Sequence, residues 1–222
     1  MKIKLISKQD LAKNITTYRF NKPPNFKYIA GQYSEFHLKH TDSDERGIVR
    51  WFTLSSAPEE DFIEFTTKHQ DTKSSSFKLA LKGLKKGDQL DIFDAMGDYV
   101  LPLDIFKPLI FVAGGIGITP ILSILKHLKI KGTKRPIYLY YITKKEEEVD
   151  IKHYLGCIKK LYVYHSSKDF NIKDILDLID SIKPKEYYVY LSGPQTMVEE
   201  NANIIKKCDA QSNIILDYFE GY

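Results

Sequence analysis

The feature that most constrains this 222-residue chain is an uncharged stretch from Pro108 to Leu125. It opens at 109–113 with Leu-Ile-Phe-Val-Ala, a composition that predicts a strand buried on both faces. Glycines follow at 114, 115 and 117, and then Thr119 and Pro120, which suit an N-cap and a first helical position. Apolar residues then recur at helical spacing, at positions 121, 124, 125 and 128. The stretch therefore predicts a strand, a glycine turn and a helix.

The glycine turn has two interpretations. Glycines let the backbone approach a ligand closely, and a helix N-terminus offers free N–H groups and a partial positive charge to a phosphate. The pattern Gly-x-Gly-x-x-Pro at 115–120 is one residue short of the dinucleotide-binding fingerprint, so a tight structural turn is the alternative. The stretch is also too short and too broken by glycines for a membrane span, which needs roughly 20 apolar residues.

Composition narrows the classes of protein. The formal charge of +4 is spread along the chain, so we expect no nucleic-acid partner. Cys157 and Cys208 lie far apart and form neither a disulfide framework nor an iron–sulfur ligand set. The six histidines show no metal-binding spacing, and the N-terminus lacks the apolar core of a signal peptide. We therefore expect a cytoplasmic protein with no metal and no membrane span.

The first hundred residues have the pattern of a β domain, because short candidate strands alternate with turn-forming segments. One helix is expected at 75–84. The candidate strands cover residues 3–7, 16–21, 32–40, 49–55, 62–68 and 89–93.

From Lys107 the periodicity changes to alternating strands and helices, which predicts a parallel sheet wrapped by helices. The candidate strands cover 109–113, 137–142, 161–164, 187–192 and 214–219. The candidate helices cover 119–131, 146–155, 172–182 and 195–207. We place the domain boundary near 103–107 and expect a ligand in the cleft between the domains.

A second motif, Arg-Trp-Phe-Thr-Leu-Ser-Ser at 50–56, combines a cation, two aromatic rings and three hydroxyls. An arginine can neutralise a pyrophosphate with two hydrogen bonds, and an aromatic face can stack on a flat ring. Hydroxyls can donate to or accept from ring heteroatoms. The alternative is an ordinary strand that ends in a turn.

Five motifs in order resemble the ferredoxin–NADP reductase family over nearly the whole chain. Arg50 to Ser56 is similar to its flavin motif, with Phe52 in the usual tyrosine position. The other four similar elements are Gly31-Gln32-Tyr33, Ser75-Ser76-Phe77-Lys78, the glycine turn with its Thr119-Pro120, and Ser192-Gly193-Pro194-Gln195-Thr196-Met197.

The resemblance implies a six-stranded antiparallel Greek-key flavin-binding barrel at 1–104 and a five-stranded parallel αβα NAD(P)-binding domain at 105–222. It implies an enzyme that passes hydride from NADPH or NADH to FAD and then electrons to a separate one-electron acceptor, ferredoxin-like or another redox protein. The alternative is a non-catalytic flavin- or nucleotide-binding regulatory module. The oligomeric state stays open.

The resemblance also implies the site residues. Thr53 would lie near flavin N5, Phe52 along the isoalloxazine and Ser192 near the nicotinamide. The implied catalytic residues are Thr53, Ser192, Phe219 and Glu220. The implied cofactor-binding residues are Tyr33, Arg50, Trp51, Phe52, Thr53, Leu54, Ser55, Thr66, Lys68, Ser75, Ser76, Gly115, Gly117, Thr119, Lys144, Gly193, Pro194 and Tyr222.

Two details of the resemblance are ambiguous. The tail matches the family either through Asp217-Tyr218-Phe219 or through Glu220-Gly221-Tyr222, and we favour Phe219 as the ring nearest the flavin. Lys144 follows the second strand of the α/β domain, where relatives that take the 2′-phosphate of NADPH often carry an arginine. We expect NADPH on this basis; the alternative is that Lys144 belongs to a solvated turn.

Overall fold

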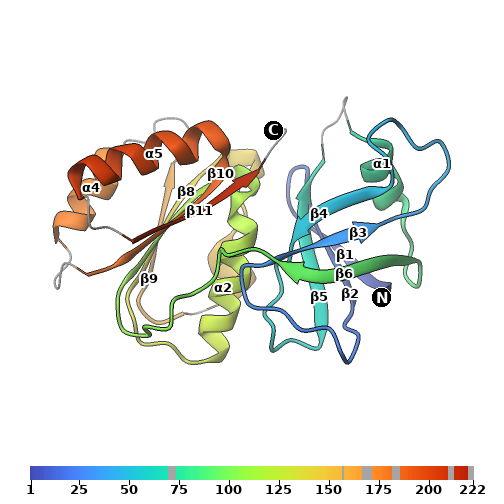
Figure 1. The fold of residues 1–222 in the computed structure, drawn as a ribbon, viewed down its shortest axis with the longest axis horizontal. Helices are drawn as coiled ribbons and strands as arrows, with labels where there is room; N and C mark the ends of the chain where they lie inside the picture. Colours follow the sequence, from blue (N-terminus) through green and yellow to red (C-terminus); the bar gives the residue numbers. More distant parts are fainter. Residues whose placement is uncertain (70–73, 157, 167–171, 182–185, 210–212, 220–222) are drawn as a thin grey trace.

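A computed structural model describes residues 1–69, 74–156, 158–166, 172–181, 186–209 and 213–219, which form two consecutive sheets (Figure 1). The first sheet is antiparallel, in the order β4-β3-β6-β1-β2-β5. A bridge between Leu54 and Phe65 joins the end of β4 to β5, so the sheet closes on itself. Its elements are β1 (Lys2–Ala12), β2 (Ile15–Asn21), β3 (Tyr33–His37), β4 (Val49–Thr53), β5 (Phe62–Lys68), α1 (Ser76–Gly83) and β6 (Gln89–Met96). The predicted six-stranded antiparallel barrel is confirmed.

Aromatic side chains fill the barrel because the inward positions of its strands alternate with outward polar ones. The Phe65 ring lies 4.4 Å from the Phe52 ring and 4.7 Å from the Phe36 ring, measured between centroids. The outward residues of the same strand, Glu64 and Thr66, are also buried, which means that something covers the outer face of β5.

The second sheet is parallel, in the order β11-β10-β7-β8-β9, with the strand of the glycine stretch at its centre. Its strands are β7 (Leu109–Gly114), β8 (Ile137–Ile142), β9 (Leu161–Ser166), β10 (Tyr188–Pro194) and β11 (Asn213–Phe219). Its helices are η1 (Gly115–Gly117), α2 (Ile118–Ile130), η2 (Lys145–Glu147), α3 (Ile151–Leu155), α4 (Ile172–Ser181) and α5 (Gln195–Cys208).

Strand β7 is buried on both faces, as its composition predicts. Leu109 and Phe111 pack into the core under α2 and α3, whereas Ile110 and Val112 pack into the core under α4 and α5. Helices therefore cover both faces of the sheet, and α2 lies between the sheet and the barrel (Figure 1). The predicted αβα architecture is confirmed.

Two local predictions are wrong. The expected helix at 146–155 is instead the short turn η2 followed by α3. The break occurs because the Asp150 carboxylate accepts a hydrogen bond from the backbone N–H of His153 and caps a new helix. Helix α2 begins at Ile118 with Gly117 as its N-cap, so Thr119 and Pro120 are the second and third helical residues. Proline is tolerated there because the first N–H groups of a helix have no intrahelical partner.

The two sheets meet along α2 and the strand β10. The apolar core under α2 continues into Ile15, Ala30 and Tyr99 of the barrel. The Tyr190 hydroxyl donates a hydrogen bond to the carbonyl of Val100 at 2.9 Å. This junction fixes where the glycine turn lies relative to the barrel. No helix in the described ranges is long and apolar enough to cross a membrane.

Candidate active site

The glycine turn lies where three strands from both domains converge. Turn η1 follows the carboxyl end of β7 and lies against β10 and β11 of its own sheet and against β5 of the barrel. Ligands of open α/β sheets bind at the carboxyl ends of the strands. The N-terminus of α2 and the barrel strand therefore border one site.

The glycines of the turn serve two different purposes. A side chain at Gly117 would place its Cβ 2.3 Å from the carbonyl oxygen of Ser192, so this glycine is required by the packing of β10. Gly115 has a φ of +53° and open space around its missing Cβ, and therefore leaves room for a ligand beside the helix N-terminus. Thr119 is buried, and its Oγ1 donates to the carbonyl of Ile116 at 3.0 Å, inside the turn.

Ser192 lies at the carboxyl end of β10 beside a carboxylate that the sequence analysis did not assign. Its register partner on β11 is Asp217, and the Ser192 hydroxyl donates to Asp217 Oδ2 at 3.3 Å. Burial raises the pKa of Asp217 to about 6, against the hydrogen bond from Ser192, which lowers it. The acid-x-aromatic tail pattern contained the signal for this residue.

The end of β11 brings the tail to the same place. Phe219 is half-buried and pairs in register with Pro194, directly after Gly193. Glu220 and Tyr222 lie outside the described residues, so the choice between the two tail rings stays a prediction.

Strand β4 carries the first part of the second motif, and its successive side chains point alternately to the two faces of the sheet. Phe52 is buried in the barrel core against Phe65, and its role along the isoalloxazine stays a prediction. The aromatic ring that β4 exposes is Trp51, which is 66% exposed and donates from Nε1 to Glu35 Oε2 at 3.0 Å. Thr53 ends the strand and is buried.

The predicted hydroxyls beyond Thr53 form a buried chain. The Ser55 hydroxyl lies 3.0 Å from Thr66 Oγ1, which in turn contacts Thr17 Oγ1. Leu54 packs in the barrel core and contributes only its backbone to this region. These contacts link the end of β4 to the outer face of β5.

Two further barrel residues of the prediction contact other parts of the chain. Tyr33 is the register partner of Thr53, and its ring packs on Gly97, where a Cβ would come within 2.9 Å. The Lys68 ammonium forms an ion pair with Glu147 of η2 at 2.6 Å, so it reaches across to the second domain.

A separate cluster of cations surrounds the start of α1. Arg50 Nη1 donates to the carbonyl of Arg46 at 2.7 Å, but its Nη2 is buried without a hydrogen-bond partner in the described part of the chain. Ser75 caps the helix by accepting from the backbone N–H of Lys78, and the backbone N–H of Ser76 donates to Asp44.

Lys78 belongs to this cluster, although only Ser75 and Ser76 of its motif were expected to bind the cofactor. Burial and the neighbouring charges of Arg50 and Lys68 lower the pKa of its ammonium to about 8. An additional anion would raise the pKa of Lys78 and would give Nη2 of Arg50 a hydrogen-bond partner. A phosphate group fits this cluster, and FAD carries two.

The predicted site residues thus fall into two groups. One group lies near the glycine turn: Thr66, Ser192 and Phe219 belong to strands that contact the turn, and Thr53 ends the strand that a bridge at Leu54 joins to β5. The other surrounds the start of α1, on the side of the barrel away from the second domain (Figure 1). Arg50 and Thr53 belong to the same strand, which spans from one group to the other.

Lys144 lies apart from both groups, on the segment after β8. It is exposed and extended, with a φ of −65° and a ψ of 144°. A cavity of about 400 Å³ lies at the carboxyl ends of β8 and β9, bordered by Ile142, Tyr164 and Asp174, and Lys144 follows Ile142 by two residues. This position suits the outer part of a dinucleotide that runs along the strand ends.

Comparison with known families agrees with this division. The family described as oxidoreductase FAD-binding domain matches residues 2–100, and the ferric reductase NAD binding domain matches residues 106–212. The two models together match nearly the whole chain, which therefore belongs to the FAD- and NAD-binding oxidoreductases. The FAD and NAD(P) cofactors of the prediction are confirmed at this level.

Sequence comparison finds relatives that are longer than this chain. Flavohemoprotein A of Dictyostelium discoideum is 27% identical over 96% of this chain and 58% of its own length. The phthalate 4,5-dioxygenase oxygenase reductase subunit of Pseudomonas putida is 29% identical over 65% of this chain and 44% of its own. The chain therefore spans about half the length of such curated relatives.

Solved structures agree on the fold. The ferredoxin NADP+ reductase of Neisseria gonorrhoeae, crystallised with FAD and NADP, superposes with a TM-score of 0.78 at 18% identity. The superposition covers 99% of this chain and 98% of that one. A likeness at this identity concerns the fold.

The raised pKa of Asp217 predicts a pH-dependent stability. The folded state binds this proton more tightly than the unfolded state, whose carboxyl has a pKa of 3.8, so the favourable contribution is lost as the pH rises through about 6. We compare the unfolding free energy of Asp217→Asn with that of wild type at each pH. We expect the difference to shift in favour of Asp217→Asn by about 1–3 kcal/mol as the pH is raised from 5 to 8. Urea unfolding at several pH values measures this. Parallel stability curves for the two proteins would contradict the assignment.

Proposed function

We propose that this chain is a flavin-dependent NAD(P)H oxidoreductase that passes electrons to a separate one-electron acceptor protein. The observation that carries the proposal is the contact of the glycine turn η1 with both barrel strand β5 and tail strand β11. It joins a helix N-terminus suited to a nicotinamide nucleotide with a barrel suited to a flavin. A ligand in each would meet at Thr53, Ser192 and Phe219.

The residues of the chain would share the work as follows. Arg50, Lys78 and the N-terminus of α1 would hold the flavin diphosphate. The N-terminus of α2 would hold the phosphates of the nicotinamide nucleotide, with Gly115 providing the space. When bound, FAD accepts a hydride from the reduced nicotinamide and can release electrons singly.

Around the reacting atoms the protein supplies alignment and hydrogen bonds. The Thr53 hydroxyl would donate to flavin N5. Ser192 would hold the nicotinamide while Asp217 accepts its hydroxyl hydrogen. With a pKa of about 6, Asp217 can also exchange a proton near neutral pH.

Relatives support a separate acceptor. The propane 2-monooxygenase reductase component of Mycolicibacterium goodii is 30% identical over 54% of this chain and 33% of its own length. Its name describes it as the reductase component of a monooxygenase, which implies that a separate protein accepts the electrons.

The cytoplasmic location also stays a proposal from the sequence.

Colour tests the proposed function directly. We expect the purified protein to be yellow and to bleach anaerobically when NADPH or NADH is added, since hydride transfer reduces the flavin. A protein that takes up FAD but is not reduced by either coenzyme would be the non-catalytic module, and the proposal would be wrong.

The phosphate cluster gives a second prediction. Arg50→Ala should weaken FAD binding about ten- to hundredfold, because a charge-assisted hydrogen bond is worth roughly 1.5–3 kcal/mol. Arg50→Lys should lose less, since it keeps the charge but not the planar guanidinium. Titration of the apoprotein with FAD measures both dissociation constants. Equal affinity in Arg50→Ala and wild type would remove Arg50 from the site.

The choice of coenzyme gives a third. We expect NADPH to be preferred through Lys144, and Lys144→Ala to reduce kcat/KM for NADPH about fivefold relative to NADH, since an exposed charge contact is worth about 1 kcal/mol. Lys145→Ala is the matched control, because this neighbour is equally exposed. An unchanged NADPH-to-NADH ratio in Lys144→Ala would show that Lys144 does not contact the 2′-phosphate.

A further inference from the structure

Helix α2 serves both domains. Its N-terminus lies at the glycine turn, and its polar side chains form a stripe at helical spacing that faces the barrel. The Ser123 hydroxyl donates to the carbonyl of Ser56 at 2.6 Å. His127 and Lys131, one turn and two turns further on, both contact Glu59, at 3.0 Å and 3.1 Å. Polar contacts therefore hold α2, which follows the glycine turn, against the barrel along its length.

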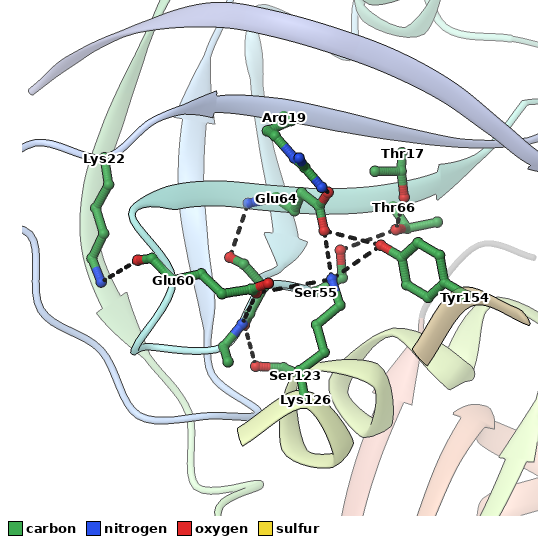
Figure 2. Close-up of polar contacts among 12 residues, drawn as sticks. Thr17, Arg19, Lys22, Ser55, Glu60, Glu64, Thr66, Ser123, Lys126 and Tyr154 are labelled. Carbon is green, nitrogen blue, oxygen red and sulfur yellow. Dashed lines mark hydrogen bonds and ion pairs between the residues drawn. The ribbon is translucent and has the colours of Figure 1, made fainter. Parts of the chain in front are cut away.

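The centre of this stripe is Lys126, which meets Glu64 of β5 and Tyr154 of α3 (Figure 2). Lys126 Nζ lies 2.6 Å from Glu64 Oε2 and donates to the Tyr154 hydroxyl at 3.0 Å. The Tyr154 hydroxyl donates to the same Glu64 oxygen at 2.9 Å. Glu64 Oε1 accepts from Arg19 Nη2 at 2.7 Å and from Arg19 Nε at 2.9 Å. We call Glu64, Lys126 and Tyr154 the interdomain cluster.

The interdomain cluster is almost closed to solvent. The Glu64 side chain is 1% exposed and that of Lys126 is 11% exposed. Although burial alone would raise it, Lys126 and Arg19 hold the pKa of Glu64 below its usual range. The carboxylate is therefore charged, buried and fully paired.

A buried ion pair of this kind is weak evidence for stability, because the cost of desolvating two charges offsets their attraction. Apolar residues of similar volume often stabilise a fold as well or better. Directional contacts instead select one position of α2 on the barrel, because a shift of the helix would leave buried charges unpaired. The cluster thus restricts how the two domains sit on each other.

The backbone of Glu64 is tied to the flavin motif. Its N–H donates to Ser56 Oγ at 2.9 Å, and its carbonyl accepts from the N–H of Ser55 at 2.7 Å. One residue therefore holds the end of β4 through its backbone and α2 through its carboxylate. Hydride transfer requires the reacting atoms to approach to about 3–3.5 Å, and a misplacement of 1 Å can cost about a hundredfold in rate.

We infer that Glu64, Lys126 and Tyr154 are positioning residues that set the approach of the nicotinamide to the flavin without binding either cofactor. The inference rests on the proposed function, because it concerns the rate of the hydride transfer proposed above. It differs from a structural role in what it predicts: the rate within the bound complex changes, whereas the binding of coenzyme and of FAD does not.

Lys126→Met tests the inference, since it removes the charge, keeps the length and leaves Glu64 paired with Arg19. Anaerobic stopped-flow reduction of the FAD-loaded enzyme over a range of coenzyme concentrations gives a limiting rate and an apparent Kd. We expect the limiting rate to fall at least about tenfold, with the apparent Kd within about threefold of wild type and the FAD content equal. Lys152→Met is the matched control: Lys152 is exposed on α3, two residues before Tyr154, and the variant should stay within twofold in rate.

Tyr154→Phe keeps both charges and provides a second variant if Lys126→Met fails to fold. It should lower the limiting rate by a smaller factor, again without a change in Kd. A limiting rate within twofold of wild type in the folded variant, with only a lower unfolding temperature, would overturn the inference. A wild-type flavin that neither NADPH nor NADH reduces would overturn the proposed function, and the positioning role with it.

Discussion

A buried contact between Glu64 and Lys126 joins the two halves of this molecule, together with the apolar core under α2. Each half has its own sheet, and the domains of one chain move relative to each other unless their interface prevents it. Here one carboxylate on a barrel strand meets one ammonium on the helix that follows the glycine turn, at 2.6 Å and almost without solvent. Holding α2 there would bring the proposed ligand sites of the two halves together.

Around the start of α1, several cations lie close together. Arg50 and Lys68 lie close enough to Lys78 to lower its pKa. One buried nitrogen of Arg50 has no hydrogen-bond partner in the described ranges. Such an arrangement costs stability in the absence of an anion and returns it when a diphosphate binds, so FAD should stabilise the fold as well as equip it for chemistry. The cations around the start of α1 would pair with a bound ligand, whereas the charges of the interdomain cluster pair with each other.

Local patterns in the sequence predicted most of the fold. The period-2 strands, the glycine turn and the buried central strand follow from residue order alone, and the five motifs indicated the family. Local signals failed where a competing local contact exists. Asp150 starts a new helix within the expected one, and α2 begins at Ile118, before Thr119, whose hydroxyl donates to the carbonyl of Ile116.

The interdomain contact could not be predicted, because it joins residues 62 positions apart on elements of different domains. Asp217 was within reach, since its tail pattern resembles the family, but its pairing with Ser192 depends on the register of two strands. Phe52 shows a different limit. The motif places a ring on β4, but the alternation of the strand decides whether Phe52 or Trp51 faces outward.

A comparison of unfolding signals from the two domains tests the central claim, that the domains form one unit. Trp51 is the only tryptophan of the chain and reports on the barrel, whereas α2 to α5 of the second domain dominate the helical circular dichroism. In urea, the fluorescence and helical transitions of the FAD-loaded protein should coincide in midpoint and slope, as a single cooperative unit requires. Two separate midpoints in the wild-type protein would show that the domains unfold independently and would contradict the account.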